Sequence, residues 1–244
     1  MNLDKRIVLV VGGAAGIGRA AAEECASRGA TVVVADVNEK EGVAAAQATQ
    51  GWFVPVDVTE ESSVAKLFDG IAARYGKLDV LIQAAGILQG AYFPVEEFPL
   101  EVFRNVVDVN LVGSFLCSKA AVPLMKKAGR GVILLVSSVA ATGVSSSVAY
   151  GSSKGGVSSL GVTLAGKLAP DNIRVNVVHP GGIKTNMKLS VIAREAELRG
   201  GSGEQAWATA AAGSELGEPA GVGRILAWLA GDDADYVRGF IHTR

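Results

Sequence analysis

Short apolar runs alternate with longer helical stretches along most of this 244-residue chain. The runs are continuous and rich in β-branched residues, which is typical of parallel strands that are covered on both faces. The expected strands are Ile7–Val11, Thr31–Ala35, Trp52–Val54, Val80–Ile82, Val132–Val136 and Arg174–Val178, and residues 240–244 fit a short edge strand. The expected helices are Gly16–Arg28, Glu39–Gln50, Glu60–Tyr75, Leu100–Lys126, Ala149–Leu168 and Pro219–Leu229.

This alternation predicts an α/β fold. Strands and helices that follow one another through short connections form a parallel sheet with right-handed crossovers, so we expect a doubly wound Rossmann fold with helices on both faces. The sequence contains no internal repeat and no linker, so residues 1–244 are expected to form a single domain. One irregular region, at 186–217, is expected to cross one end of the sheet as a substrate lid.

Composition narrows the class of protein. Hydrophobic residues make up 49% of the chain and the net charge is −1, with no cluster of Lys and Arg, which argues against nucleic-acid binding. The two cysteines, Cys25 and Cys117, lie far apart without a metal-ligand spacing, so we expect a reducing compartment and no metal site. We find no signal peptide and no apolar run that is long enough to span a bilayer, so a cytoplasmic protein is expected.

A glycine-rich turn follows the first strand. Gly12 permits a tight turn, Gly16 allows the backbone to approach a pyrophosphate, and Gly18 packs the next helix against the strand. The amino end of that helix, at Ala15 and Ile17, then offers amide donors to the phosphates. With 31 glycines in 244 residues, this G-x-x-x-G-x-G spacing would arise by chance in roughly one of two such chains, so its place between strand and helix carries the argument.

An acidic residue closes the second strand. Asp36 lies 18 residues after Gly18, where a carboxylate accepts hydrogen bonds from the adenosine ribose and repels a 2′-phosphate. Val37 stands where an arginine would hold that phosphate. The two positions favour NAD over NADP.

A second cluster of residues can carry acid–base chemistry. Tyr150 and Lys154 are spaced i and i+4, so on a helix they lie on one face. An ammonium beside a phenol stabilises the phenolate, which can exchange a proton with an alcohol or a ketone. Ser137 and Ser138 end a strand at the carboxyl edge of the sheet, where open α/β sheets bind their ligands.

Taken together, these motifs resemble those of the short-chain dehydrogenase/reductase family along nearly the whole chain. The matching set, in order, is Gly12, Gly16, Gly18, Asp36, Asp57-Val58-Thr59, Ala84-Ala85-Gly86, Asn110, Ser138, Tyr150, Lys154 and Pro180-Gly181-Gly182-Ile183-Lys184-Thr185. Each motif has low specificity by itself. The resemblance is specific because all of the motifs occur, and in the order in which the family has them.

The resemblance implies a role for each matched residue. Tyr150 would be the general acid/base, Lys154 would lower the pKa of Tyr150 and hold the nicotinamide ribose, and Ser138 would orient the substrate oxygen. Asn110 would hold a water that links Lys154 to solvent, although it also fits a buried residue at a helix bend. The expected cofactor contacts are Asp57 and Val58 on the adenine, Ala84, Ala85 and Gly86 on its ribose, and Pro180, Gly181, Ile183 and Thr185 on the nicotinamide.

The sequence also departs from the family pattern. Gln83-Ala84 replaces a usual Asn-Asn, so side-chain bonds that brace the sheet are lost or rerouted. The loop at 139–148 is one residue short, which leaves Ser137 as an alternative to Ser138. The last strand ends early, which weakens an edge that the family often uses to form tetramers. The resemblance to the family still implies a homo-oligomer, tetramer or dimer.

We therefore expect an NAD-dependent oxidoreductase that moves a hydride between nicotinamide and a secondary alcohol or ketone. Three other functions share part of this pattern: an NADP-linked carbonyl reductase, a catalytically silent dinucleotide-binding scaffold, and an S-adenosylmethionine-dependent methyltransferase. The methyltransferase also pairs a glycine-rich turn with an acidic residue, but it does not need the serine, tyrosine and lysine cluster.

Overall fold

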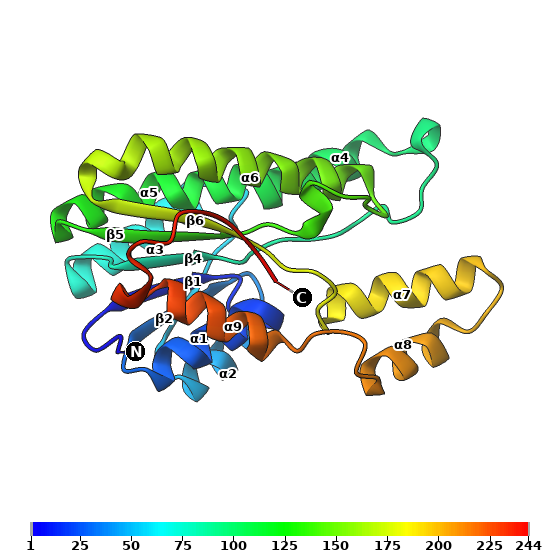
Figure 1. The fold of residues 1–244 in the computed structure, drawn as a ribbon, viewed down its shortest axis with the longest axis horizontal. Helices are drawn as coiled ribbons and strands as arrows, with labels where there is room; N and C mark the ends of the chain where they lie inside the picture. The colour runs from blue at the N-terminus through cyan, green and yellow to red at the C-terminus, as the bar shows by residue number, and fades with distance from the viewer. Residues whose placement is uncertain (1, 244) are drawn as a thin grey trace.

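The computed structural model describes residues 2–243, which form a seven-stranded sheet between two layers of helices (Figure 1). Each neighbouring pair of strands is parallel. The strand order is β3 (Trp52–Pro55), β2 (Thr31–Asp36), β1 (Ile7–Val11), β4 (Val80–Gln83), β5 (Gly131–Val136), β6 (Ile173–His179) and β7 (Gly239–His242). The predicted doubly wound Rossmann fold is thereby confirmed, and the suggested edge strand is β7.

The two helical layers bury the two sides of each strand. The helices are α1 (Gly16–Ser27), α2 (Glu39–Ala48) and α9 (Pro219–Leu229) on one face, and α3 (Glu61–Tyr75), α5 (Gly113–Ala128) and α6 (Val148–Leu168) on the other. In β1, Leu9 belongs to the hydrophobic cluster beneath α3, α5 and α6, and Val10 belongs to the cluster beneath α1 and α9. This alternation explains why the strand is apolar at every position. The short 3-10 turns are Val95–Glu97, Val139–Ala141, Ala169–Asp171 and Asp232–Ala234.

The helix that we expected at Leu100–Lys126 is interrupted. It consists of α4 (Leu100–Val107), a π-helical turn at Asp108–Val112, and α5. By length and composition alone, Leu100–Ala128 qualifies as a membrane-crossing helix, so the expectation that the chain lacks such a run was wrong. In the structure this stretch is a core helix, because Leu116, Cys117, Ala121 and Met125 are buried in the cluster beneath the sheet.

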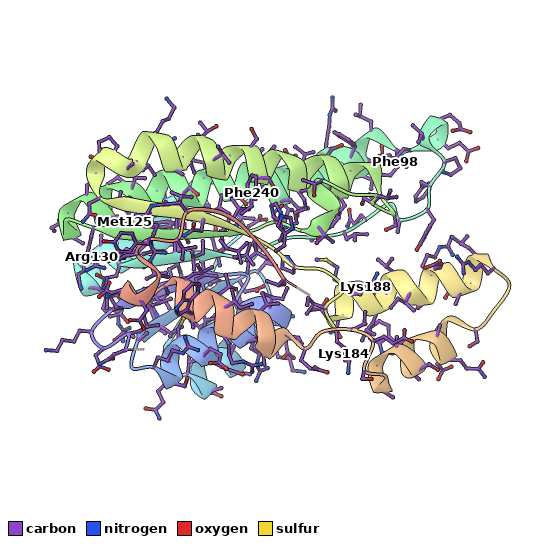
Figure 2. All side chains as sticks on the ribbon, viewed as in Figure 1. Phe98, Met125, Arg130, Lys184, Lys188 and Phe240 are labelled. Atoms are coloured by element: carbon purple, nitrogen blue, oxygen red, sulfur yellow. The ribbon has the colours of Figure 1, made fainter. Side chains whose placement is uncertain are left out.

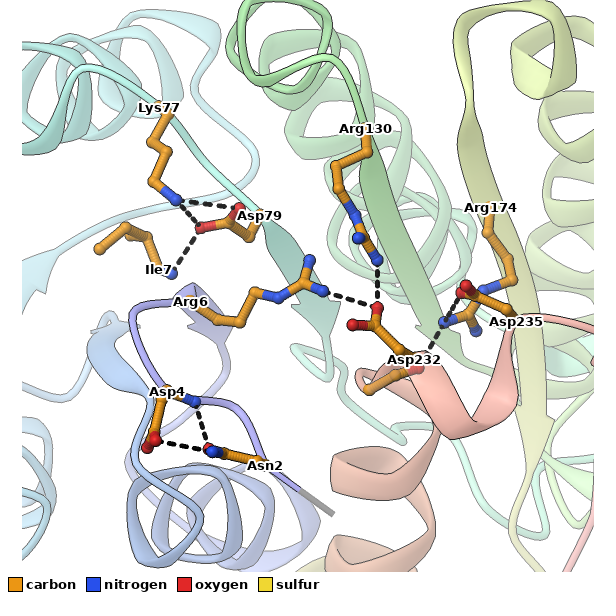
Figure 3. Close-up of polar contacts among 11 residues, drawn as sticks. Asn2, Asp4, Arg6, Ile7, Lys77, Asp79, Arg130, Arg174, Asp232 and Asp235 are labelled. Atoms are coloured by element: carbon orange, nitrogen blue, oxygen red, sulfur yellow. Dashed lines mark hydrogen bonds and ion pairs between the residues drawn. The ribbon is translucent and has the colours of Figure 1, made fainter.

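Ion pairs close the amino end of the sheet (Figure 3). Asp232 accepts hydrogen bonds from Arg6, at 2.6 Å, and from Arg130. Asp79 accepts from the amide of Ile7 at 2.8 Å and pairs with Lys77. These contacts join segments that lie far apart in sequence and stabilise the amino end of the sheet. The opposite, carboxyl end remains available for a ligand.

The region at 186–217 is not irregular as expected, since most of it forms two helices. They are α7 (Asn186–Leu198) and α8 (Gly203–Ala212), whose first turns are capped by the side chains of Thr185 and Ser202. Figure 1 shows them projecting beyond the carboxyl edge of the sheet, and Lys184 and Lys188 mark the base of this arm in Figure 2.

Candidate active site

The site begins where the strand order changes direction, between β1 and β4. Such a switch point leaves a crevice outside the carboxyl ends of the strands. Gly12 turns the chain there with a φ of 79°, and a Cβ at this position would lie 2.4 Å from the amide nitrogen of Ala85. Only glycine fits, because both the backbone conformation and the close approach exclude a side chain.

The helix that follows is built to approach an anion. A Cβ on Gly18 would lie 2.0 Å from the carbonyl oxygen of Gly12, so the first turn of α1 packs directly on the glycine-rich turn. No side chain caps this helix at Ala15. Its first amides therefore point toward the crevice without a side-chain acceptor, as in dinucleotide-binding proteins.

A cavity of about 1110 Å³ extends from this turn along the carboxyl edge of the sheet. It is larger than most sites for small ligands, and its size suits a dinucleotide together with a small substrate. It brings together all the sequence-predicted cofactor-binding residues: Gly12, Ala15, Gly16, Ile17, Gly18, Asp36, Val37, Asp57, Val58, Ala84, Ala85, Gly86, Tyr150, Lys154, Pro180, Gly181, Ile183 and Thr185. Ser138 also lines it, whereas Asn110 does not.

The Asp36 carboxylate is held in place by the backbone around it. Oδ2 accepts a hydrogen bond from the amide of Ala14 at 3.0 Å, and Oδ1 accepts one from Asn38, also at 3.0 Å. The nearby cation that lines the cavity, Arg19, is engaged with carboxylates: it pairs with Glu23 at 2.9 Å and lies 4.0 Å from Glu41. The net charge of the side chains at this end of the cavity is thus negative.

Ser138 and Tyr150 meet at the other end of the cavity. Burial raises the pKa of the Tyr150 phenol, and the side-chain hydrogen bond with Ser138 opposes that rise. Ser137 points elsewhere: its hydroxyl donates to the carbonyl oxygen of Lys154 at 2.8 Å and lies 3.0 Å from the hydroxyl of Ser158. The shortened loop therefore leaves Ser138, and not Ser137, beside the tyrosine.

Lys154 is buried below Tyr150. Its ammonium donates a hydrogen bond to the carbonyl oxygen of Val136 at 2.9 Å, and burial lowers its pKa to about 8. The ammonium lies 5.7 Å from the centre of the Tyr150 ring. The lowering of the Tyr150 pKa by Lys154 stays a prediction.

Asn110 lies in the π-helical turn and braces the floor of the site. Its Oδ1 accepts from the amide of Ile87 at 2.8 Å, and its Nδ2 donates to the carbonyl of Ile87 at 3.0 Å and to Ser153 at 2.9 Å. These bonds join the loop after β4 to α6, the helix that carries Tyr150 and Lys154. They match the alternative of a buried residue at a helix bend.

Comparison with known proteins agrees with this arrangement. The model of the short chain dehydrogenase family matches residues 6–196, which is more than half of the chain. The chain belongs to the short-chain dehydrogenase family. It is an oxidoreductase of a family that uses nicotinamide cofactors.

Relatives of this dehydrogenase are similar along nearly their whole length. It is 39% identical to cis-4-hydroxycyclohexanecarboxylate dehydrogenase of Sinomonas cyclohexanicum, with 97% of this chain and 94% of the relative covered. It is 34% identical to cyclopentanol dehydrogenase of Comamonas testosteroni, with 98% and 94% covered. The solved structure of levodione reductase superposes with a TM-score of 0.89 at 27% identity, covering 98% of this chain and 96% of that one.

One departure of this dehydrogenase from the family pattern, at Gln83, leaves a buried side-chain amide. Gln83 is 1% exposed, and neither polar atom of its side-chain amide has a hydrogen-bond partner among residues 2–243. It lies in register with Val11 and Leu135 in the middle of the sheet. The bracing that an asparagine pair would give is therefore lost at Gln83, while Asn110 supplies bracing elsewhere.

Sequence reasoning missed a second cavity beside the first. Its volume is about 460 Å³, and it lies between the loop after β4 and one face of α7. The Tyr92 hydroxyl donates a 2.8 Å hydrogen bond to Oε2 of Glu195 and so ties that loop to α7. No spacing in the sequence indicates this contact, because the two residues are separated by 103 positions.

Proposed function

We propose that this dehydrogenase transfers a hydride between NAD and a secondary alcohol or ketone, with Tyr150 as general acid/base. The observation that carries the proposal is that Ser138, Tyr150 and Lys154 line the same cavity as the glycine-rich turn and Asp36. A silent scaffold would need the dinucleotide end of the cavity but not the polar cluster at its far end.

The residues at the first end fit a dinucleotide, and they favour NAD. Gly12 and Gly18 leave room that a Cβ would fill, so the backbone can approach a pyrophosphate. Asp36 presents its carboxylate beyond the second strand, and Arg19 pairs with Glu23 and lies 4.0 Å from Glu41. A 2′-phosphate would be repelled by the Asp36 carboxylate and would compete with two further carboxylates for Arg19.

The nicotinamide would supply or accept the hydride at the reacting carbon, and the residues of this chain would handle the proton. In ketone reduction, Ser138 donates a hydrogen bond to the substrate oxygen while Tyr150 gives it the phenol proton. In alcohol oxidation, the Tyr150 phenolate takes the hydroxyl proton. Lys154 would supply positive charge beneath the tyrosine and would hold ribose hydroxyls, and the hydrogen bonds of Asn110 support the helix that carries both residues.

The substrate class follows from the walls of the cavities and from the relatives. The second cavity is walled by Ile87, Leu88, Phe93, Met187 and Val191, which are apolar. The relatives named above act on cyclic alcohols. We infer a secondary alcohol on a small alicyclic ring, bound beneath a lid made of α7 and α8 within a single domain of residues 1–244.

Titration of the purified protein with NADH and with NADPH, followed by nicotinamide fluorescence, tests the cofactor assignment. We expect tighter binding of NADH by about tenfold or more, because removing or repelling one charged group at a built site is worth at least about 1.4 kcal/mol. The Asp36→Ala variant should lose most of this preference. Tighter binding of NADPH by the wild-type protein would overturn the assignment, and binding of neither would overturn the proposed function.

A further inference from the structure

The second cavity carries one feature that the proposed chemistry does not use. Among the described residues that line it, Arg194 is the one charged side chain. The other lining residues are small, apolar or neutral. No lining carboxylate from residues 2–243 offsets the guanidinium within the cavity.

Arg194 reaches this cavity because of its place on α7. Met187, Ser190, Val191 and Arg194 are spaced by three, one and three residues, so they lie on one face of the helix. All four line the second cavity opposite the loop after β4. The Tyr92–Glu195 hydrogen bond fixes that loop against α7 at the residue next to Arg194.

The internal partner of Arg194 is weak. Glu197 lies one turn further along the exposed side of α7, with its carboxylate 3.3 Å from the guanidinium, and both side chains are more than half exposed. An exposed ion pair of this kind contributes little and is readily exchanged. The guanidinium therefore has donors left for a second carboxylate, which it can bind in a bidentate manner.

The two cavities share a wall but not their functional residues. Gly86–Gln89, Met187 and Val191 line both cavities, whereas Ser138, Tyr150 and Lys154 line the first alone and Arg194 lines the second alone. Val191, which lines both cavities, is separated from Arg194 by three residues, or about 4.5 Å along a helix. An anion at Arg194 would therefore lie beside the wall that the two cavities share, and outside the end of the first cavity that Ser138, Tyr150 and Lys154 line.

We propose that Arg194 binds the carboxylate of a hydroxy acid whose hydroxyl and carboxylate lie on opposite sides of an alicyclic ring. This inference rests on the proposed function, since it places the reacting hydroxyl at Ser138 and Tyr150. It assigns a carboxylate site to α7, separate from the hydride-transfer end of the first cavity. A 2-hydroxy acid does not fit, because its carboxylate adjoins the reacting carbon.

Steady-state kinetics with three alcohols test the substrate preference. The substrates are 4-hydroxycyclohexanecarboxylate, 2-hydroxycyclohexanecarboxylate and cyclohexanol, each with saturating NAD. We expect the wild-type enzyme to prefer the 4-hydroxy acid by kcat/KM. In Arg194→Gln, KM for that acid should rise about tenfold or more while kcat/KM for cyclohexanol stays within about twofold, because a charge-assisted hydrogen bond is lost. Arg194→Lys should recover part of the loss, since lysine keeps the positive charge but lacks the paired N–H donors with which a guanidinium binds a carboxylate.

Arg224→Gln is the matched control. Arg224 is exposed on α9 and lines neither cavity. This variant should leave the acid preference within about twofold of wild type, as expected for a surface substitution. Equal losses on the acid and on cyclohexanol in Arg194→Gln, or no acid preference in the wild type, would overturn the carboxylate site.

A binding measurement separates this inference from the proposed function. Calorimetric titration of the NADH-loaded protein with cyclohexanecarboxylate and with cyclohexanecarboxamide needs no turnover. We expect the acid to bind at least tenfold more tightly than the amide, and Arg194→Gln to abolish the difference. Equal binding of both probes would overturn the site, whereas acid-selective binding without oxidation of any alcohol would support the site and refute the proposed function.

Discussion

The Lys154 ammonium and the Val136 carbonyl oxygen are 2.9 Å apart in the interior of the protein, where β5 ends beneath α6. Lys154 is 4% exposed, and burial lowers its pKa from 10.5 to about 8. A group that binds its proton less tightly when folded destabilises the fold wherever both states are charged. The role proposed for Lys154 in the active site accounts for this cost.

Lys154→Met should stabilise the cofactor-free protein at pH 7. A pKa that falls from 10.5 to about 8 corresponds to about 3 kcal/mol, so we expect the free energy of unfolding to rise by about 1–3 kcal/mol. Below pH 8 the cost is fully present, and it fades as the pH rises from 8 to 10.5, because the unfolded state then binds more protons. Denaturant unfolding at several pH values measures this.

Lys167→Met is the control for that measurement, since Lys167 lies exposed on the same helix. It should change stability by less than about 0.5 kcal/mol. A Lys154→Met protein that is less stable than wild type across this pH range would show that the ammonium is satisfied where it lies.

The acid–base role of Tyr150 predicts a pH dependence. Burial holds the pKa of its phenol above 10, so the phenol form dominates at neutral pH. Ketone reduction needs that form and should be level through neutral pH, whereas alcohol oxidation needs the phenolate and should rise about tenfold per pH unit toward the pKa. Profiles of kcat/KM in both directions measure this.

Ser138→Ala should move the alkaline rise to higher pH, since the hydrogen bond from Ser138 lowers the pKa of Tyr150. Ser152→Ala, on the exposed side of α6, should leave the profile in place. A shift to lower pH in Ser138→Ala would contradict the assigned hydrogen bond.

Tyr92→Phe should loosen the arm without changing the chemistry. It removes the hydrogen bond to Glu195, and Tyr92 lines neither cavity. We expect faster amide hydrogen exchange in α7, a KM for the alcohol that rises about two- to tenfold, and unchanged affinity for NADH. Unchanged exchange in α7 would show that other contacts hold the arm.

Gln83→Leu should stabilise the protein. The buried amide of Gln83 has no partner among residues 2–243, and its neighbours Val11 and Leu135 are apolar. Removing an unsatisfied polar group should raise the free energy of unfolding by about 1–2 kcal/mol. Gln47→Leu, at an exposed position of α2, should have no comparable effect in the same denaturant experiment. A loss of stability in Gln83→Leu would mean that the amide is satisfied.

The sequence contained enough to predict the fold and the cofactor end of the site, because those features are local. The strands are apolar at successive positions, and the Gly12 turn and Asp36 sit at fixed places relative to the strands. The π-helical turn at Asn110 was not predictable, since Asn110 bonds there to Ile87 and Ser153, which lie 23 and 43 positions away in the sequence.

The electrostatics of the site could not be predicted from the sequence either, because they depend on contacts that form only in the folded protein. The spacing of Tyr150 and Lys154 correctly placed them on one helix, but the pKa of Lys154 depends on its burial and on the carbonyl of Val136. The second cavity and Arg194 escaped notice for a related reason. The cavity needs the loop after β4 to face α7, and that contact joins distant segments through Tyr92 and Glu195.

Turnover by Tyr150→Phe tests the central claim most directly. The wild-type protein should oxidise an alicyclic secondary alcohol with NAD, and the variant should bind NADH within about threefold of wild type. Its kcat should fall about 10²-fold or more, because the proton would have no acceptor. Unchanged kcat in a folded, NADH-binding Tyr150→Phe protein would contradict the assignment of Tyr150 as the acid/base.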